Sequence, residues 1–518
     1  MRRPSSLQLP VLSDASTSTP QPVIHGRARL GAQAVASRAG PLRALHRLRA
    51  AVGDVASDRR AGGVRDVASA AWPVVFSMLS FTAMGVVDTL FVAQLGRDPL
   101  AGAALGHLAT MLTGALLLGG LRGVNIVVAQ AVGAGELAMA TRAGWAGAIV
   151  ALVAGLGILA LAPFASLVAA LFGGNVAVQE HAATTFAIRA WGAPAWLMLT
   201  AIGQAMQGRG DTRTPMVANV GANLLNVALD ALLVFGWQGV VIGGVTVGAV
   251  PAMGVAGAAW ATSISLGLGG LGLLLEFWRR RGWARPGVAE FRALLVVGLP
   301  IGVRFLLDFG GWATLTALLA RVGAAEVAAT QVAIRVISVS FLPGFGISEA
   351  ASMLVGQAVG AGDDERARRV FRSAAGLAVS IMAAFAVVFA LWPVPILAAF
   401  AADDEVLAIG RNLLLWAAAF QVFDALCVVA MGALGGAGDT RFVMWAVIVG
   451  TWLVQVPLGW WLGVKLGYGA AGVWAAVAVE CAVKAAIFGE RWRRGGWRGR
   501  AVVQRAGEGA AQAPAHAA

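Results

Sequence analysis

The hexapeptide QAVGAG occupies residues 130–135 of this 518-residue chain and occurs again at residues 357–362, an offset of 227. The tetrapeptide GDTR, at residues 210–213, returns at residues 438–441 with almost the same offset, 228. Motifs that recur in the same order and at one spacing indicate an internal duplication. The chain is therefore predicted to consist of two related halves.

Long apolar segments surround both copies of these motifs. Hydrophobic residues make up 58% of the chain and charged residues only 13%, and the mean hydropathy is +0.77. A soluble protein carries about a quarter charged residues, whereas about 20 apolar residues cross the ~30 Å hydrocarbon core of a bilayer as a helix. The composition excludes a soluble globular protein and predicts an all-α integral membrane protein. Twelve apolar segments are present, at residues 67–95, 103–132, 138–172, 182–206, 214–235, 252–277, 291–320, 327–359, 370–400, 406–434, 442–462 and 470–488.

Each half then holds six transmembrane helices. Because six is an even number, both halves enter the membrane from the same side, and the repeat is parallel. Two such lobes can rock against each other around a shared cavity. The predicted boundaries are a disordered, Arg-rich cytoplasmic tail at 1–64, an N-terminal lobe at 65–278, a cytoplasmic linker at 279–292, a C-terminal lobe at 293–490 and a basic disordered tail at 491–518.

The basic residues predict the orientation. Lys and Arg number 39 against 26 Asp and Glu, a net charge of +13. Lys and Arg near helix ends accumulate on the cytoplasmic side of membranes, and 30 of the 39 fall on one side if the N-terminus is cytoplasmic. The outer loops hold only Arg97, Arg321 and Lys465. We therefore expect a multi-pass membrane protein with both termini in the cytoplasm, whose charge meets lipid headgroups rather than nucleic acid.

Acidic residues inside the apolar segments are the candidate functional groups, because an ionised side chain at mid-bilayer costs ~2.5–3.5 kcal/mol on insertion scales. They are expected to face one water-accessible hollow between the two bundles. Asn219, Asn223, Asn226 and Asp230 are spaced as a stripe on one helix face, which indicates either an ion or proton site or hydrogen-bonding contacts between helices. The six acids are Asp88, Asp230, Asp308, Glu349, Asp424 and Glu480.

Asp424 follows Phe420 and Gln421 by about one helical turn. A carboxylate, an aromatic ring and an amide presented together suit an organic cation through charge and cation–π attraction. Asp88 lies near the outer end of the first segment, where it is either part of a cation site or a partly hydrated surface carboxylate.

Three ion pairs are suggested by spacing. Arg304 and Asp308, and Glu480 and Lys484, are four residues apart and share a helix face; the second pair is interpreted as structural. Arg122 and Glu349 occupy equivalent positions in the two repeats, so a salt bridge between the halves is also expected. The three pairs are Arg304–Asp308, Glu480–Lys484 and Arg122–Glu349.

Enzymatic chemistry has little support in the sequence. The two lysines follow no phosphate-binding glycine loop, and the five histidines form no metal-ligand cluster. Cys427 and Cys481 lie in apolar segments without partners at metal-ligand spacing, so neither a disulfide framework nor a zinc site is predicted. The protein is not expected to be an enzyme, and no cofactor is implied.

From Asp66 to Arg491 the chain resembles the multidrug and toxic compound extrusion (MATE) family. The resemblance rests on GVVDTLF at 85–91, the doubled QAVGAG, the doubled GDTR with Thr214-Pro215 after the first copy, and Asp424 before the second. It implies two six-helix lobes in a V, which export organic, often cationic compounds in exchange for inward Na⁺ or H⁺.

The family's branches imply particular site residues. Members of the NorM type carry acids in spans one, seven and ten, which fall on Asp88, Asp308 and Asp424 here, although span seven commonly has Glu. Phe420 stands where NorM-type sequences can have Tyr. Asn226 and Asp230 are similar to the N-lobe cation site of the DinF-type branch, so Na⁺ is expected either at Asp230 and Asn226 or at Asp308 and Asp424.

The predicted function is a secondary antiporter of the bacterial inner membrane that acts as a monomer and exports small organic cations or drugs in exchange for Na⁺ or H⁺. One alternative is a lipid-linked precursor flippase of related fold, which Arg122, Arg304 and Arg335 would favour by making the cavity more cationic. A second alternative is a non-transporting structural membrane protein, in which the polar stripe would be packed shut.

Overall fold

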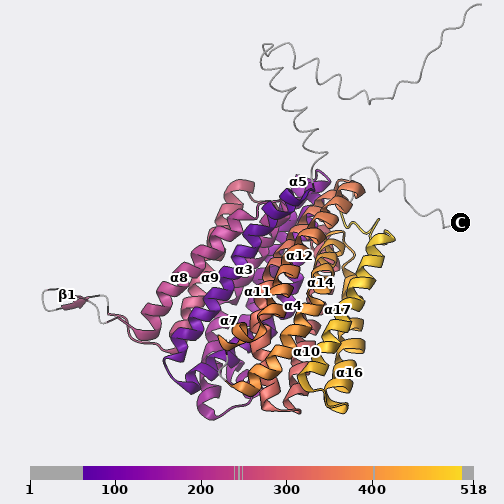
Figure 1. The fold of residues 1–518 in the computed structure, drawn as a ribbon. Helices are drawn as coiled ribbons and strands as arrows, with labels where there is room; N and C mark the ends of the chain where they lie inside the picture. The colour runs from indigo at the N-terminus through magenta and orange to yellow at the C-terminus, as the bar shows by residue number, and fades with distance from the viewer. Residues whose placement is uncertain (1–61, 238–239, 243–244, 248, 401–402, 504–518) are drawn as a thin grey trace, which may run out of the picture. The chain divides into compact units, whose positions relative to one another are not determined.

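The computed structural model describes residues 62–237, 240–242, 245–247, 249–400 and 403–503. Most of the N-terminal tail predicted at 1–64, and the last part of the C-terminal tail, lie outside these residues. Within them the chain is helical apart from one short hairpin, and long helices run side by side through the bundle (Figure 1).

The first half supplies six membrane-crossing helical units, one of them broken near its end. Pro163 falls at the break, where a missing backbone N–H interrupts the helical hydrogen bonds. In chain order the elements are α3 (Val64–Ala93), α4 (Arg97–Gly133), α5 (Leu137–Leu159) with η1 (Ala162–Phe164) and α6 (Ala165–Ala170), α7 (Val176–Gly208), α8 (Arg213–Phe235) and α9 (Val255–Arg281).

The second half repeats this order. Its fifth unit contains two π-helical segments, η2 and η3, which widen the helix locally. The elements are α10 (Val288–Ala320), α11 (Ala324–Gly360), α12 (Asp364–Leu391) with α13 (Pro393–Ala398), α14 (Asp404–Gly436), α15 (Thr440–Ile448) with η2 (Val449–Gln455), α16 (Val456–Gly459) and η3 (Trp460–Lys465), and α17 (Gly469–Arg493).

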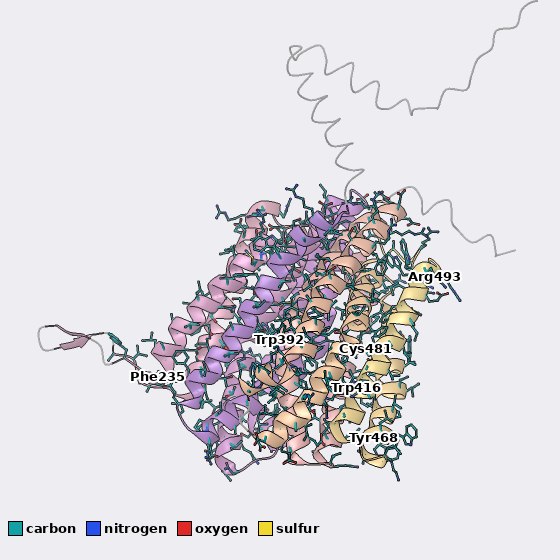
Figure 2. The ribbon with its side chains drawn as sticks, viewed as in Figure 1. Phe235, Trp392, Trp416, Tyr468, Cys481 and Arg493 are labelled. Atoms are coloured by element: carbon teal, nitrogen blue, oxygen red, sulfur yellow. The ribbon has the colours of Figure 1, made fainter. Side chains whose placement is uncertain are left out.

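Twelve helical units match the twelve predicted segments. Eleven are long and apolar enough to cross a membrane by length and composition. The twelfth, α7, is less apolar because it carries Glu180, Arg189 and Gln204. Large side chains such as Trp392, Trp416 and Tyr468 are exposed on the outside of the helices (Figure 2), as expected where the solvent is lipid. The predicted all-α membrane fold is confirmed.

Glycines bring α4 of the first half into close contact with α10 of the second. A Cβ atom on Gly119 would lie 2.8 Å from Cα of Gly302, and one on Gly123 would lie 2.8 Å from Cα of Gly298. Each helix thus presents two glycines four residues apart, a pattern that lets membrane helices approach closely. The two halves meet along this crossing.

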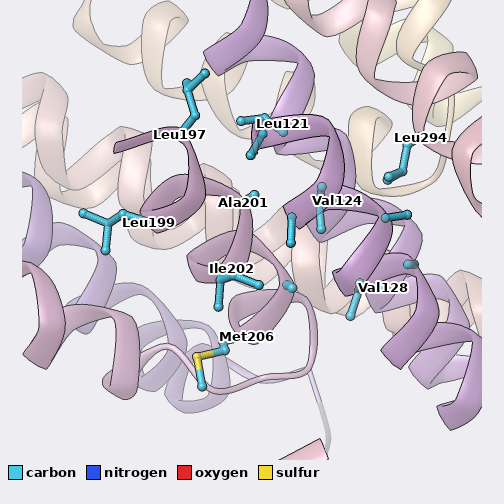
Figure 3. Packing of buried hydrophobic residues seen from close by; sticks show 14 of the residues in the cluster. Leu121, Val124, Val128, Leu197, Leu199, Ala201, Ile202, Met206 and Leu294 are labelled. Atoms are coloured by element: carbon cyan, nitrogen blue, oxygen red, sulfur yellow. The ribbon is translucent and has the colours of Figure 1, made fainter. Parts of the chain in front are cut away.

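The core of the first half extends into the second. Leu121 and Val124 of α4 lie in one buried cluster with Leu197 and Ile202 of α7, and Leu294 of α10 belongs to the same cluster (Figure 3). Arg142 on α5 also forms an ion pair with Glu290 at the start of α10, with an Nε–Oε1 distance of 2.5 Å. The first helix of the second half is therefore anchored on the first half.

Two connections differ from the sequence-based boundaries. The predicted linker at 279–292 is mostly helical, because α9 continues to Arg281 and α10 begins at Val288. Between α8 and α9 a two-stranded antiparallel hairpin, β1 (Val240–Ile242) and β2 (Val245–Val247), pairs Val240 with Val247. The predicted helical segments ended on either side of this hairpin without identifying it.

The prediction of a disordered tail from residue 491 onward is wrong for residues 491–503. Helix α17 continues to Arg493 at the end opposite Tyr468 (Figure 2). Arg491 pairs with Asp439 at 2.8 Å, and the buried ring of Trp497 stacks on Trp492 with centroids 4.7 Å apart. Composition alone suggested disorder, but burial of aromatic rings and pairing of charges hold this segment in place.

Candidate functional site: a cavity between the halves and a buried polar cluster

A cavity of about 810 Å³ lies between the two halves. Helices of both halves contribute to its wall: Phe81 comes from α3, Trp196 from α7, Phe305 from α10, Phe341 from α11 and Trp474 from α17. The cavity thus has a mostly apolar wall with several aromatic rings, as is usual for small-molecule sites, and charged side chains at particular points.

The repeated QAVGAG motifs close one end of the interface between the halves. A Cβ atom on Gly133 would lie 1.9 Å from the carbonyl oxygen of Gln357, and one on Gly360 would lie 2.1 Å from that of Gln130. Only glycine allows this approach. Gln130 Nε2 also donates to the Gly436 carbonyl at 2.9 Å, and Gln357 Nε2 donates to the Gly208 carbonyl at 3.1 Å. The duplication therefore builds a pseudo-symmetric seal.

The GDTR motifs occupy the turns beside this seal. Gly210 and Gly438 adopt φ values of 90° and 92°, in the left-handed region that favours glycine. The aspartate of each motif pairs with an arginine near the end of the last helix of its own half: Asp211 with Arg280 at 2.9 Å and Asp439 with Arg491 at 2.8 Å. These aspartates are structural groups outside the cavity.

Arg122 and Glu349 form a salt bridge between the halves. Arg122 Nη1 donates to Glu349 Oε1 at 2.8 Å, and its guanidinium lies 4.5 Å from the ring centroid of Phe345 and 5.3 Å from that of Phe305. The pair suggested by the repeat offset is present, and both side chains line the cavity.

Arg304 and Asp308 also line the cavity, with Nη1 and Oδ2 3.8 Å apart. Arg304 is buried and its guanidinium also contacts the sulfur of Met431. The spacing of four residues on α10 places the two charges together, as predicted. The Asp308 carboxylate therefore has a permanent cationic neighbour.

Asp424 lines the cavity together with Phe420, one helical turn earlier on α14. Phe420 packs on Trp474 with ring centroids 6.2 Å apart. The sequence also placed Gln421 on this surface, and that placement is wrong. Gln421 is fully buried and donates to the Ser340 hydroxyl on α11 at 2.6 Å. Residues 420 and 424 share a helix face, whereas residue 421 is rotated by about 100° from residue 420 around the helix axis.

The last helix contributes Glu480 and Lys484 to the cavity wall, and their side chains form an ion pair. Thr451 Oγ1 donates to Glu480 Oε1 at 3.5 Å. The predicted pair is present. It was interpreted as structural, whereas both side chains line the cavity.

Asp88, Asn223, Asn226 and Asp230 lie in the first half, on α3 and α8, and not in the wall of the cavity. Together with Thr262 on α9 we call them the N-half polar cluster. Asn226 and Asp230 are fully buried. Thr262 Oγ1 on α9 donates to Asp88 Oδ2 on α3 at 3.2 Å, and α8, which carries Asp230, packs against both of these helices.

Most oxygen atoms of the N-half polar cluster have no partner. In the part of the chain that the structure describes, no hydrogen bond reaches five of them. Asn223 uses only its amide nitrogen, which contacts the Ser80 hydroxyl. A buried polar atom without a partner costs roughly 1–3 kcal/mol. The unpartnered oxygens are Asp88 Oδ1, Asn223 Oδ1, Asn226 Oδ1, Asp230 Oδ1 and Asp230 Oδ2.

The expectation that all six acids face one hollow is therefore wrong. Asp308, Glu349, Asp424 and Glu480 line the cavity, whereas Asp88 and Asp230 are not part of its lining. Asn219 joins the two places, since it lines the cavity at one end of the polar stripe on α8. Helical spacing predicted that these residues share one face of α8, but not which of them line the cavity.

Three polar residues of the first half were not singled out from the sequence. Thr262 and Ser80 complete the surroundings of the N-half polar cluster. Arg189 on α7 is also buried. Arg189 could have been found by its position, because it is one of the few basic residues inside an apolar segment; a serine or threonine in such a segment gives no comparable signal.

Comparisons with known proteins agree with this architecture. The MatE family model matches residues 73–232 and 300–461, one match in each half. The "Probable multidrug resistance protein NorM" of Pseudomonas putida is 30% identical over 454 residues, which cover 84% of this chain and 95% of the relative. Its counterpart of the same name in Pseudomonas aeruginosa is 32% identical over 448 residues, covering 82% and 88%.

Solved structures share the fold. A structure titled "Outward-facing conformation of a multidrug resistance MATE family transporter of the MOP superfamily" superimposes with a TM-score of 0.76 at 21% identity, over 84% of this chain and 96% of that one. A MOP superfamily transporter from Pyrococcus furiosus gives a TM-score of 0.75 at the same identity and coverage. The family match in both halves and the similarity over most of the chain lead to one conclusion: this protein belongs to the MATE family of membrane transporters and is not an enzyme.

Proposed function

We propose that this protein is a multidrug exporter of the bacterial inner membrane, which moves organic cations outward in exchange for Na⁺ or H⁺. Relatives that carry the name multidrug resistance protein support the export of drugs. The observation that carries the coupling is the N-half polar cluster, where five buried oxygen atoms of the described chain lack partners. We further propose that the protein acts as a monomer with both termini in the cytoplasm.

The cavity fits bulky lipophilic cations. Its volume of about 810 Å³ falls within the range of drug-sized pockets, roughly 300–1,000 Å³. Phe305, Trp312 and Phe341 line it, and so does Asp424. Aromatic faces attract cations through their quadrupole, more strongly where water is excluded. A planar or branched cation can therefore exchange its hydration for ring contacts while Asp424 balances its charge.

The N-half polar cluster fits a small cation. Hard cations prefer oxygen ligands, and the cluster offers carboxylate oxygens from Asp88 and Asp230 and amide oxygens from Asn223 and Asn226. A bound Na⁺ would engage oxygens of Asp88, Asn226 and Asp230, whereas a proton would be held between the two carboxyl groups. Either cation relieves the repulsion between two buried carboxylates.

The two sites share helices, which gives a route for coupling. On α3, Phe81 lines the cavity and Asp88 lies in the cluster; on α8, Asn219 lines the cavity and Asp230 lies in the cluster. A cation that pulls α3 and α8 together in the cluster also changes the cavity wall. Coupling requires that each ligand prefers a different arrangement of these helices.

The closed end of the interface between the halves favours release of the drug to the outside. The seal of Gln130 and Gln357 lies at the end of the helices that the distribution of basic residues assigns to the cytoplasm. With the cytoplasmic end sealed, the cavity would release its drug outward and accept the coupling ion from outside.

The runner-up functions have less support. Arg335, one of three arginines that favoured a flippase of anionic lipid-linked precursors, is exposed and does not line the cavity. Arg122 and Arg304 do line it, but Glu349 and Asp308 accompany them. A structural protein with its polar residues packed shut would have no need for a cavity of this volume between its halves.

Transport in a defined system tests the proposal. Purified protein reconstituted in vesicles is expected to move ethidium against its gradient when an opposing Na⁺ or pH gradient is imposed. Asp230→Asn is expected to abolish the ion dependence while ethidium still binds, and Asp424→Asn is expected to weaken ethidium binding. If neither gradient drives ethidium, or a wider panel of organic cations, across wild-type vesicles, the exporter proposal is wrong.

A further inference from the structure

Seven charged side chains line the cavity, and six of them form three ion pairs. Arg122 pairs with Glu349, Arg304 with Asp308, and Lys484 with Glu480. Asp424 is the seventh, and no ion pair joins it to any described residue. With four carboxylates and three basic groups, the cavity carries a formal net charge of −1. The third basic group, Lys484, decides whether this charge is −1 or −2.

The neighbouring helical segment η2 leaves room for the side chain of Lys484. The lysine stem passes over Gly450, where a Cβ atom would lie 3.0 Å from Cγ and 3.1 Å from Cδ of Lys484. Gly450 lies in η2, a π-helical segment, and such segments often mark functional positions. The next residue, Thr451, donates to Glu480 at 3.5 Å. The pair of Lys484 and Glu480 therefore packs on a glycine and accepts a hydroxyl contact from a threonine, both in one widened segment of the neighbouring helix.

Stability alone gives a weak reason for such a pair. Side chains of Lys484 and Glu480 are 16% and 3% exposed, and desolvating two charges offsets much of their attraction. An apolar pair of similar volume often stabilises a protein as well. The position of the pair in the wall of a cavity that already holds Asp308 and Asp424 instead suggests a role in setting the electrostatic potential of the chamber.

We propose that Lys484 is a tethered cation that selects the charge of the exported drug. With Lys484 in place, the cavity has one carboxylate in excess, Asp424, and therefore accepts an organic cation with one charge. A dication would leave a second charge uncompensated in the chamber. This inference rests on the proposed export of organic cations and adds a specificity-determining residue to it.

Ethidium and propidium provide a matched pair of probes, since they share a phenanthridinium ring and carry one and two positive charges. Their affinities for the purified full-length protein can be measured by fluorescence titration. Wild type is expected to prefer ethidium. Lys484→Met makes the formal cavity charge −2 and should shift the ratio of affinities toward propidium by on the order of tenfold, whereas Lys484→Arg should keep the wild-type ratio.

Glu480 supplies the charge-matched controls. The double variant Glu480→Gln/Lys484→Met restores a formal charge of −1 without either group and should return to the wild-type ratio. Glu480→Gln alone makes the formal charge zero and should weaken binding of both dyes, that of propidium more. A lysine that only supports the fold would not produce a ratio that follows net charge across this series.

The outcomes separate this inference from the proposed function. If wild type binds neither dye, export of such cations is overturned. If wild type binds ethidium but the folded Lys484→Met protein keeps the wild-type ratio, only the role of Lys484 is overturned. Should Lys484→Met not fold, as judged by size-exclusion chromatography, Glu480→Gln and the double variant decide: equal ratios in wild type and Glu480→Gln would contradict selection by charge.

Discussion

The side-chain amides of Gln130 and Gln357 cross the boundary between the halves in opposite directions, each donating to a glycine carbonyl of the other half, Gly436 and Gly208. The pairing is symmetric only in part. Gln130 Oε1 also accepts the backbone N–H groups of Val502 and Val503, at 2.8 and 3.3 Å. The end of the described chain therefore reinforces one of two equivalent contacts.

Removing these amides is expected to loosen the seal unequally. Gln130→Ala leaves the Gly436 carbonyl and two backbone N–H groups unpartnered, whereas Gln357→Ala leaves one carbonyl. At roughly 1–3 kcal/mol for each buried unsatisfied group, Gln130→Ala should destabilise the closed end more. Hydrogen exchange at residues 126–133 measures this opening, and equal protection in the two variants would contradict the asymmetry.

The segment around Val502 is expected to act as a strap across the seal. Val503 is buried in the core of the first half and Trp497 in that of the second, although both follow α17. A chain that ends at residue 500 loses the buried Val503, the half-buried Val502 and both bonds to Gln130. Burial of one such side chain contributes about 1.5–3 kcal/mol. The closed end of this shortened chain should exchange amide hydrogen faster.

A chain that ends at residue 503 is the matched control. It keeps the strap and lacks only the residues beyond it, so its exchange should equal that of the full chain. Faster exchange in this control as well would assign the effect to residues 504–518 instead of the strap.

Na⁺ is expected to stabilise the protein through the N-half polar cluster. A ligand that binds only the folded state adds about 1.4 kcal/mol at a tenfold excess over its Kd and about 2.7 kcal/mol at a hundredfold excess. The thermal unfolding temperature of the purified protein should therefore rise when NaCl replaces choline chloride at constant ionic strength. Asn226→Ala and Asp230→Asn should abolish this rise.

Asp424→Asn serves as the control, because Asp424 lies in the cavity and not in the cluster. It should keep the Na⁺-dependent rise. A Na⁺ effect lost in Asp424→Asn and kept in Asp230→Asn would place the cation in the second half; a wild type without any Na⁺ effect would leave H⁺ as the coupling ion.

The crossing of α4 and α10 is expected to tolerate no side chain. A Cβ atom on Gly298 would lie 2.4 Å from the carbonyl oxygen of Gly120, and one on Gly302 would lie 2.3 Å from that of Leu116. Gly298→Val should therefore separate the halves and lower the free energy of unfolding by several kcal/mol, since overpacking alone typically costs about 1–3 kcal/mol. Thermal unfolding measures this loss.

Gly157→Ala provides the comparison, because a Cβ atom there meets no other atom within 4 Å. It should leave the unfolding temperature unchanged or raise it slightly, as alanine favours the helix over glycine. Equal destabilisation by both substitutions would show that the α4–α10 crossing is not under the expected steric constraint.

The fold could be predicted because its causes are local or repeated. Apolar length sets where a helix crosses the membrane, so each predicted segment ends within six residues of the ends of its helical unit. The offset of QAVGAG predicted the duplication, and with it the salt bridge of Arg122 and Glu349. The ordered end of the chain was missed because its order depends on Trp497 meeting Trp492 and Val503 meeting the first half, contacts that composition does not encode.

The sequence by itself determined the helices, the two equivalent halves and the residue types that carry charge into the membrane, because hydrophobic length, repetition and spacing on a helix are properties of the chain. Only the tertiary structure decided that Asp424 lines the cavity while Gln421 turns to Ser340, and that Asp230 lies in a separate cluster. Which carboxylates share a chamber depends on how far each helix is rotated and how closely glycines let its neighbour approach. Those quantities are set by packing between segments far apart in the chain.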